Sequence, residues 1–147
     1  MGQASQEAEL AMKAALLDTG PLVAYLDSED SYHDRAALSL GGFSGTLCTT
    51  SAVITEAMYL LSGDPQGARR LAEFVQAAAM QVFEATQPHQ LLSAAALIEK
   101  YSDTPMDFAD ATLVLLSEGT ITNEIFTFDR RGFSTYRTRK GKAFRIL

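Results

Sequence analysis

Short apolar runs alternate along the chain with longer stretches in which apolar residues recur at helical spacing. The short runs have the length and composition of strands that are buried on both faces of a sheet. They predict strands at residues 14–18, 46–50, 81–85, 125–128 and 143–147. The stretches between them predict helices at residues 21–26, 31–40, 51–63, 65–79, 88–101 and 107–118.

Residues that start and stop helices support these boundaries. Pro21 suits the first turn of a helix, Ser51 is a suitable N-cap, and Gly41-Gly42 ends the second helix. Strands that alternate with helices require crossover connections, which produce a mainly parallel sheet covered on both faces. The predicted fold class is therefore α/β, with three layers in which a mainly parallel central sheet is flanked by helices.

The length of 147 residues suits one domain with a substantial core. Residues 1–11 are predicted to be a cloning remnant or a disordered leader, and residues 12–147 to be the domain. The first segment contains Glu7 and Glu9 and no continuous apolar stretch, so it does not match a secretory signal. No apolar run approaches the roughly 20 residues of a membrane span. We therefore expect a cytoplasmic protein with no membrane segment.

The sulfur and imidazole side chains do not indicate a site. Cys48 is the only cysteine and lies in a predicted strand, where a small buried hydrophobic residue is the simplest interpretation. His33 and His89 are too isolated in the sequence to indicate a zinc site.

Charge is distributed unevenly along the chain. The net charge is −6, yet residues 129–147 carry seven basic side chains and one acidic side chain. A basic segment on an acidic body can contact phosphates locally even when the total charge is negative. Two interpretations stay open at this point: the segment binds nucleic acid, or its side chains are solvated or paired with acids of the body.

Acidic residues follow several predicted strands at what would be one edge of the sheet. Asp18 ends the first strand and Asp129 follows a later one. Glu56 lies early in the helix after the second strand, while Asp107 and Asp110 open another helix. In parallel sheets, ligands bind beyond the carboxyl ends of the strands. We therefore expect these acids to converge at that edge.

Each acid also has a purely structural interpretation. Asp18 suits the N-cap of the helix that follows it, and Asp129 suits a turn. Asp107 and Asp110 have the spacing of a capping box. Glu56 differs, because it stands among apolar neighbours where a carboxylate is costly unless it is paired or bound to metal. Clustered carboxylates repel one another unless a cation intervenes. Oxygen ligands without His or Cys favour Mg²⁺ or Mn²⁺ as that cation. These ions support the hydrolysis of phosphodiester bonds.

Four segments resemble the acidic motifs of PIN-domain nucleases. They are LLDTGPLVAYLD at residues 16–27, SAVITEAMYLLS at residues 51–62, MDFADATLVLL at residues 106–116 and FTFDRRGFSTYR at residues 126–137. The segments stand in the family's order, and the resemblance extends over nearly the whole chain. Among PIN domains, the sequence is most similar to the VapC-type toxins of toxin–antitoxin pairs.

The resemblance implies a PIN-like fold, Mg²⁺- or Mn²⁺-dependent endoribonuclease activity on RNA, a homodimer, and a cognate antitoxin protein as partner. It places the catalytic and metal-binding acids at Asp18, Glu56, Asp110 and Asp129. Auxiliary roles are implied for Asp107, which would assist or only cap its helix, and for Thr127, whose hydroxyl would steady a carboxylate. The sequence departs from the family at Gly20, where many relatives carry Asn or Ser. A side chain that would orient metal-bound water is therefore missing.

Other classes of protein share parts of this pattern. Asp18-Thr19-Gly20 after two leucines resembles the active-site turn of retroviral-type aspartic proteases, but those are all-β dimers and the helical patterns contradict such a fold. A non-catalytic PIN scaffold that binds RNA or protein is expected to have lost an acid, and none is missing here. A PIN nuclease that processes cellular RNA without being a toxin remains an alternative.

Overall fold

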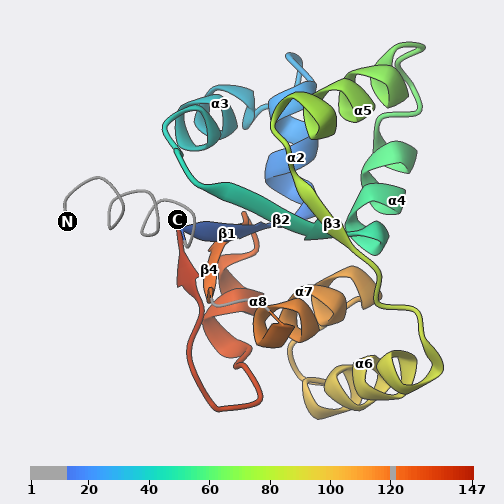
Figure 1. Ribbon diagram of the computed structural model, residues 1–147, viewed down its shortest axis with the longest axis vertical. Coiled ribbons are helices and arrows are strands. Elements are labelled where there is room, and N and C mark those ends of the chain that lie inside the picture. Colours follow the sequence, from blue (N-terminus) through green and yellow to red (C-terminus); the bar gives the residue numbers. More distant parts are fainter. Residues whose placement is uncertain (1–12, 120–121) are drawn as a thin grey trace, which may run out of the picture.

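The protein forms a five-stranded sheet with helices on both faces, as the computed structural model of residues 13–119 and 122–147 shows (Figure 1). The strands are β1 (Ala14–Leu17), β2 (Thr46–Thr50), β3 (Gln81–Phe83), β4 (Glu124–Phe126) and β5 (Arg145–Ile146). The helices are α2 (Thr19–Leu26), α3 (His33–Gly41), α4 (Ser51–Leu60), α5 (Gly67–Ala77), α6 (Pro88–Lys100), α7 (Phe108–Gly119) and α8 (Arg130–Thr135). The predicted α/β class is confirmed, and the all-β protease fold is excluded. The leader predicted at residues 1–11 lies outside the described residues.

The strands lie in the order β3-β2-β1-β4-β5, and every neighbouring pair is parallel. Helices α2, α3 and α5 lie on one side of the sheet, and α6, α7 and α8 on the other (Figure 1). Because parallel strands all end at the same edge, the residues that follow β1, β2 and β4 are neighbours in space. β1 lies between β2 and β4, so the residue that follows it is central at this edge.

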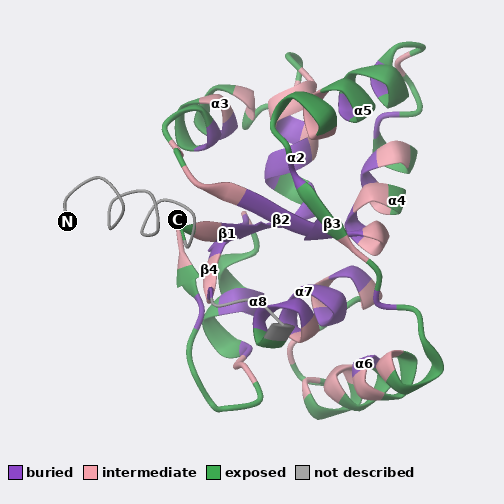
Figure 2. Ribbon diagram, viewed as in Figure 1, coloured by how far each residue is buried: buried purple, intermediate pink, exposed green. Residues whose placement is uncertain are grey.

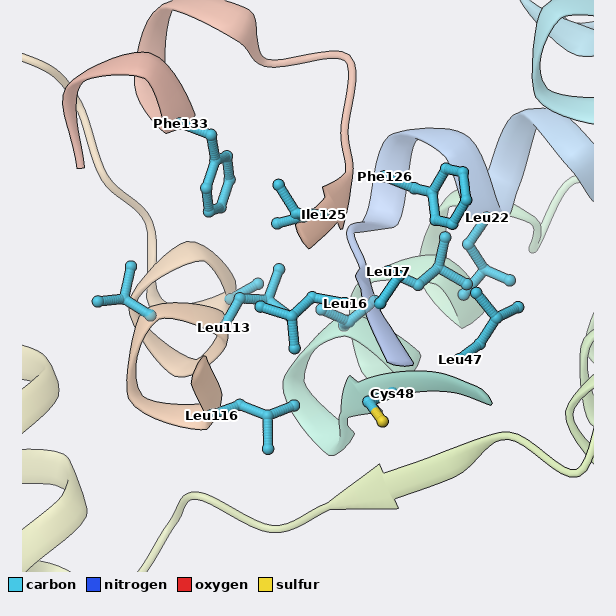
Figure 3. Packing of buried hydrophobic residues seen from close by; sticks show 14 of the residues in the cluster. Leu16, Leu17, Leu22, Leu47, Cys48, Leu113, Leu116, Ile125, Phe126 and Phe133 are labelled. Atoms are coloured by element: carbon cyan, nitrogen blue, oxygen red, sulfur yellow. The ribbon is translucent and has the colours of Figure 1, made fainter. Parts of the chain in front are cut away.

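The central strands β1, β2 and β4 are mostly buried, as expected for strands covered on both faces, whereas the edge strands β3 and β5 are largely exposed. Leu16 and Leu17 are fully buried and point to opposite faces, because successive side chains alternate along a strand. On one face, Leu16 packs with Leu113 of α7, and on the other Leu17 packs with Leu22 of α2 (Figure 3). Burial is concentrated in the central strands β1 and β2 and on the inward faces of α2 and α7 (Figure 2). Of the helices within the described residues, none is both long and apolar enough to cross a membrane.

Several local predictions were wrong in detail, and strands β3 and β5 are both shorter than the predicted residues 81–85 and 143–147. The N-cap of α4 is Thr50, whose hydroxyl accepts a hydrogen bond from the Val53 amide, whereas the predicted cap, Ser51, donates to Glu84 instead. Strand β4 ends at Phe126 rather than at residue 128. Helix α8 was not predicted, because six residues containing Gly, Ser and Thr have little helical propensity or apolar periodicity.

Candidate active site

Asp18 lies at the centre of the carboxyl edge, directly after β1. It is buried, with 8% of its surface exposed. Its two carboxylate oxygens accept hydrogen bonds from the Thr19 amide at 2.8 Å and from the Thr127 hydroxyl at 2.7 Å. Burial raises the pKa of Asp18 to about 6, and the charges of Asp107 and Glu56 raise it further against these two hydrogen bonds.

Glu56 lies on α4 and faces the start of α2. Its carboxylate accepts a hydrogen bond from the Thr19 hydroxyl at 3.3 Å, so Thr19 contacts both Asp18 through its amide and Glu56 through its side chain. Partial burial and the charge of Asp107 raise the pKa of Glu56. Glu56 is partly buried, in line with its position among apolar neighbours in the sequence, and its metal-binding role stays a prediction.

Asp107 and Asp110 form the reciprocal pair of a capping box at the start of α7. The Asp110 amide donates to Asp107 at 2.8 Å, and the Asp107 amide donates to Asp110 at 3.1 Å. Burial raises the pKa of Asp110 to about 8, with further contributions from the charges of Asp18 and Asp107. The structural interpretation of this pair is therefore correct, and Asp110 also lies within the electrostatic field of Asp18.

A pair of buried hydroxyls fixes α7 against the end of β2. Thr112 and Thr50 lie 2.8 Å apart between their Oγ1 atoms. Thr50 caps the helix that carries Glu56, and Thr112 stands two residues after Asp110. The contact therefore holds the two acid-bearing helices in a fixed relation.

Asp129 lies three residues beyond the end of β4 and is exposed. Its carboxylate accepts a hydrogen bond from the Gly132 amide at 3.0 Å and caps α8, as its turn interpretation predicts. Its amide donates to the Thr127 hydroxyl at 3.0 Å, and that same hydroxyl donates to Asp18. The prediction that Thr127 steadies a carboxylate agrees with this geometry, and the carboxylate is that of Asp18.

Tyr136 is a member of this region that the sequence did not indicate. Its ring is fully buried, and its hydroxyl donates to the Pro105 carbonyl at 2.8 Å. Burial raises the pKa of this hydroxyl, and so do the charges of Asp110, Asp129, Asp107 and Asp18. Acids from three separate segments therefore act on one phenol. An aromatic residue in a basic, polar segment gives no sequence signal of such a position.

A groove of about 600 Å³ opens beside the acids, between α4 and the start of α7. Glu56 and Asp107 line its polar side, while Tyr59 and Phe108 contribute aromatic surface. The edge of the sheet thus holds a buried acidic centre with an open groove at one flank. A polymer has room to approach these carboxylates from solvent.

The acid cluster has no cationic side chain as a partner. None of the four ion pairs between described residues includes Asp18, Glu56, Asp107 or Asp110. Raised pKa values and an all-oxygen donor set fit a hard divalent cation that would relieve the repulsion. Within residues 13–119 and 122–147, however, no group of three or more Asp, Glu, His or Cys side chains is arranged to hold a metal ion. The donor chemistry fits a divalent cation, and the carboxylates are held by helix caps and threonine hydroxyls.

The basic C-terminal segment divides into paired and unpaired side chains. Arg137 donates from one nitrogen to the carbonyls of Ser134, Thr135 and Tyr136 and so closes the end of α8. Arg139 pairs with Glu118 and Arg145 with Glu124. The side chains without a hydrogen bond or ion pair to other described residues are Arg130, Arg131, Lys140 and Lys142.

Gly20 has an aromatic side chain as a close neighbour. A Cβ atom at this position would lie 3.3 Å from Cδ2 of Phe128, so the ring would have to shift by a few tenths of an ångström to admit a side chain. The departure from the family's Asn or Ser therefore coincides with an aromatic side chain that covers the first turn of α2.

The side chains that the sequence set aside lie in ordinary environments. Cys48 is buried in β2 and packs in the core, as predicted. His33 has Nδ1 2.8 Å from the Ala24 carbonyl oxygen, which joins α3 to α2.

Comparison with known proteins agrees with this fold. The PIN domain family matches residues 15–138. A protein named ribonuclease VapC26, from Mycobacterium tuberculosis, is 28% identical over 134 residues, which are 90% of this chain and 98% of that protein. The crystal structure of M. tuberculosis VapC20, described as a sarcin-ricin loop cleaving toxin, superposes with a TM-score of 0.71 at 18% identity, covering 80% of this chain and 91% of that one. VapBC2 from Rickettsia felis, bound to a promoter DNA fragment, gives a TM-score of 0.61 at 15% identity, covering 92% and 99%.

Proposed function

Because the chain belongs to the PIN domain family, we propose that it is a Mg²⁺- or Mn²⁺-dependent endoribonuclease that hydrolyses RNA phosphodiester bonds. The observation that carries the proposal is the group of carboxylates at the carboxyl edge. Asp18, Glu56 and Asp110 come from three segments, each has a raised pKa, and none has a cationic partner among the described residues. A folded protein retains such repulsion mainly where a ligand compensates it.

The proposed roles follow from position and burial. Asp18, Glu56 and Asp110 would hold the cation, with Asp129 completing the set from the other side of Asp18. A bound divalent cation would lower the pKa of a water and stabilise charge at the phosphorus centre. Thr127 and Thr19 hold Asp18 in one orientation, so this carboxylate needs little rearrangement. Asp107 keeps Asp110 at the start of α7.

The proposal includes the setting that the resemblance implies. The named relatives include a ribonuclease and a toxin, and the VapBC2 structure is of a complex bound to promoter DNA. We infer that this chain is the toxin of a toxin–antitoxin pair, a cytoplasmic homodimer that a cognate antitoxin protein holds in check. The names of the relatives support an antitoxin partner. The homodimer and the cytoplasmic location are implied by the family resemblance.

One experiment tests the nuclease directly. Purified protein is incubated with total RNA in Mg²⁺, in Mn²⁺ or in EDTA, and the cut ends are mapped by sequencing. We expect discrete cuts that require the metal and disappear in the Asp110→Asn protein. Cutting that continues in EDTA would contradict metal dependence. Absence of cutting by the wild type in both metals, with RNA binding retained, would favour a non-catalytic PIN scaffold.

A second measurement separates a toxin from an RNA-processing nuclease. Induced expression in a heterologous bacterial host should arrest growth if the protein is a toxin. Growth should recover when the small open reading frame adjacent to its gene is co-expressed. Growth that continues while cellular RNA is trimmed at defined sites would instead support the processing nuclease.

A further inference from the structure

An aromatic and cationic surface lies beside the acid cluster, formed by the exposed Tyr32 and Arg35 and the partly buried Phe128. The rings of Tyr32 and Phe128 have centroids 5.0 Å apart. The Arg35 guanidinium lies 5.5 Å from the centroid of the Phe128 ring. The three side chains come from the turn before α3, from the segment after β4 and from α3 itself, so the fold brings together residues that are about 100 positions apart.

This surface is connected to the proposed catalytic edge by adjacent residues of the chain. Phe128 lies directly between Thr127, which contacts Asp18, and Asp129. Its ring also packs against Gly20, in the first turn of the helix that follows Asp18. The groove beside Glu56 lies after β2, whereas the aromatic surface lies after β4, so the two flank the central acid on opposite sides.

The hydrophobic core does not require this arrangement. Tyr32 is 51% exposed, although a tyrosine contributes to stability mainly through burial. Arg35 is exposed and makes no hydrogen bond or ion pair with the described residues, although its neighbour Asp34 is acidic. Its guanidinium remains stacked on an aromatic ring with its N–H groups free. An exposed ring with a free guanidinium beside it is the usual composition of a surface that binds single-stranded nucleic acid.

We propose that Tyr32 and Phe128 form a stacking surface for one base of single-stranded RNA next to the phosphate to be cut, and that Arg35 binds an adjacent phosphate. The inference rests on the proposed nuclease function and adds a determinant of substrate position. A stacked base fixes the strand relative to the acids without requiring a particular sequence, since every base has an aromatic face. The guanidinium can donate two parallel hydrogen bonds to one phosphate.

Stacking is tested by binding in the inactive Asp110→Asn background, with a ten-nucleotide oligouridylate as the probe. Affinity is measured for the intact strand and for strands that carry one abasic nucleotide at each position in turn. We expect one abasic position to weaken binding to the parent protein by about tenfold. Tyr32→Ala should weaken binding of the intact strand by the same factor, and its affinity should no longer depend on where the abasic nucleotide lies. Tyr32→Phe, which keeps the ring, should bind within about twofold of the parent. Leu38→Ala is the matched control, because Leu38 is 82% exposed on neighbouring α3.

The phosphate contact is tested by salt dependence. Each phosphate contact contributes about −0.7 to the log–log slope of affinity against salt for single strands. Arg35→Ala should flatten the slope by about that amount, and Arg35→Lys should keep the slope but bind more weakly. Arg69→Ala is the control, because Arg69 is exposed on α5 and pairs only with Glu73.

The outcomes separate this inference from the nuclease function. Cleavage of total RNA by the wild type decides the nuclease proposal independently of these variants. If the oligouridylate does not bind, or Tyr32→Ala responds to abasic positions as the parent does, the stacking surface is disproved even when RNA is cut. If Tyr32→Ala instead changes the oligomeric state in solution and leaves RNA affinity unchanged, the surface is a protein interface and the inference is wrong.

Discussion

Two charged regions of this molecule have opposite relations to their surroundings. At the carboxyl edge, Asp18 is buried and Glu56 and Asp110 are partly buried, and these three acids have no cationic partner among the described residues. In the C-terminal segment, three arginines have partners within the protein: the partly buried Arg137 bonds to carbonyls, and the exposed Arg139 and Arg145 pair with Glu118 and Glu124. The distribution of charge along the sequence would by itself have assigned nucleic-acid binding to the basic segment.

The difference shows that whether a charged side chain has a partner within the protein indicates its role better than the sign of its charge does. Exposed ion pairs contribute roughly 0–1 kcal/mol each and are compatible with a purely structural role. Buried carboxylates near one another destabilise the fold unless something is bound. The interpretation that the basic segment binds nucleic acid is therefore not supported for Arg137 and Arg139, because both guanidinium groups already have partners within the protein. Arg130 and Arg131 remain available next to Asp129.

The largest expected effect is the loss of cleavage on neutralising a buried acid. Asp110→Asn should reduce the rate by at least about a hundredfold, as expected when an electrostatic group is removed from a catalytic site. Its melting temperature without metal should not fall, because a repulsive charge is removed. Cleavage rates under saturating Mg²⁺ and thermal unfolding measure the two effects. A rate equal to that of the wild type would exclude Asp110 from the site.

The pH dependence of stability is the next expected effect. The folded pKa of Asp110 is raised from its ordinary 3.8 to about 8, so folding favours the neutral form. The stability from this group is therefore fully present below about pH 4 and is lost as pH rises through about 8. In EDTA, the wild type should lose stability between pH 5 and about 8 more steeply than Asp110→Asn. Parallel unfolding curves for the two proteins across this range would contradict the raised pKa.

Metal binding should stabilise the wild type by mass action. A hundredfold excess of Mg²⁺ over its dissociation constant gives about 2.7 kcal/mol. Glu56→Gln should respond less, because it has lost one of the proposed ligands, while Glu99→Gln, at an exposed site on α6, is the control. Thermal shifts in Mg²⁺ and in EDTA measure this difference. Equal shifts in Glu56→Gln and the wild type would remove Glu56 from the ligand set.

The smallest expected effect distinguishes paired from unpaired arginines. Arg137→Ala removes three hydrogen bonds to carbonyls and should cost about 1–2 kcal/mol of unfolding free energy, with the salt dependence of RNA binding unchanged. Arg130→Ala should do the reverse, leaving stability unchanged and flattening the salt slope by about 0.7. Denaturant unfolding and RNA titrations at several salt concentrations separate them. A flattened salt slope for Arg137→Ala would instead indicate that Arg137 contacts RNA.

Most of the fold could be predicted from the spacing of apolar residues, whereas predicting the site also required the parallel topology and the acidic motifs. Strand β2 has its predicted bounds of residues 46–50, because Gly45 precedes it and the next helix begins directly at Ser51. The positions of Asp18 and Glu56 near one another were predictable, because strands β1 and β2 are parallel neighbours. Tyr136 and the bonds of Arg137 were not predictable, since both depend on α8, a helix with no sequence pattern. The capping and proposed catalytic roles of Asp107 and Asp110 share one spacing, so sequence alone does not separate them.

The Thr127 hydroxyl imposes a direction on the hydrogen bonds that join two motif acids. The Asp129 amide can only donate, so the hydroxyl accepts there and directs its single proton to Asp18. The other Asp18 oxygen faces the Thr19 amide, which also can only donate. An asparagine at position 18 would therefore turn an N–H group toward one of these donors and force a reorientation. Asp18→Asn thus changes the direction of hydrogen bonds as well as removing a charge, so its effects would not report on the charge alone. Asp110→Asn is therefore the better choice for an inactive variant.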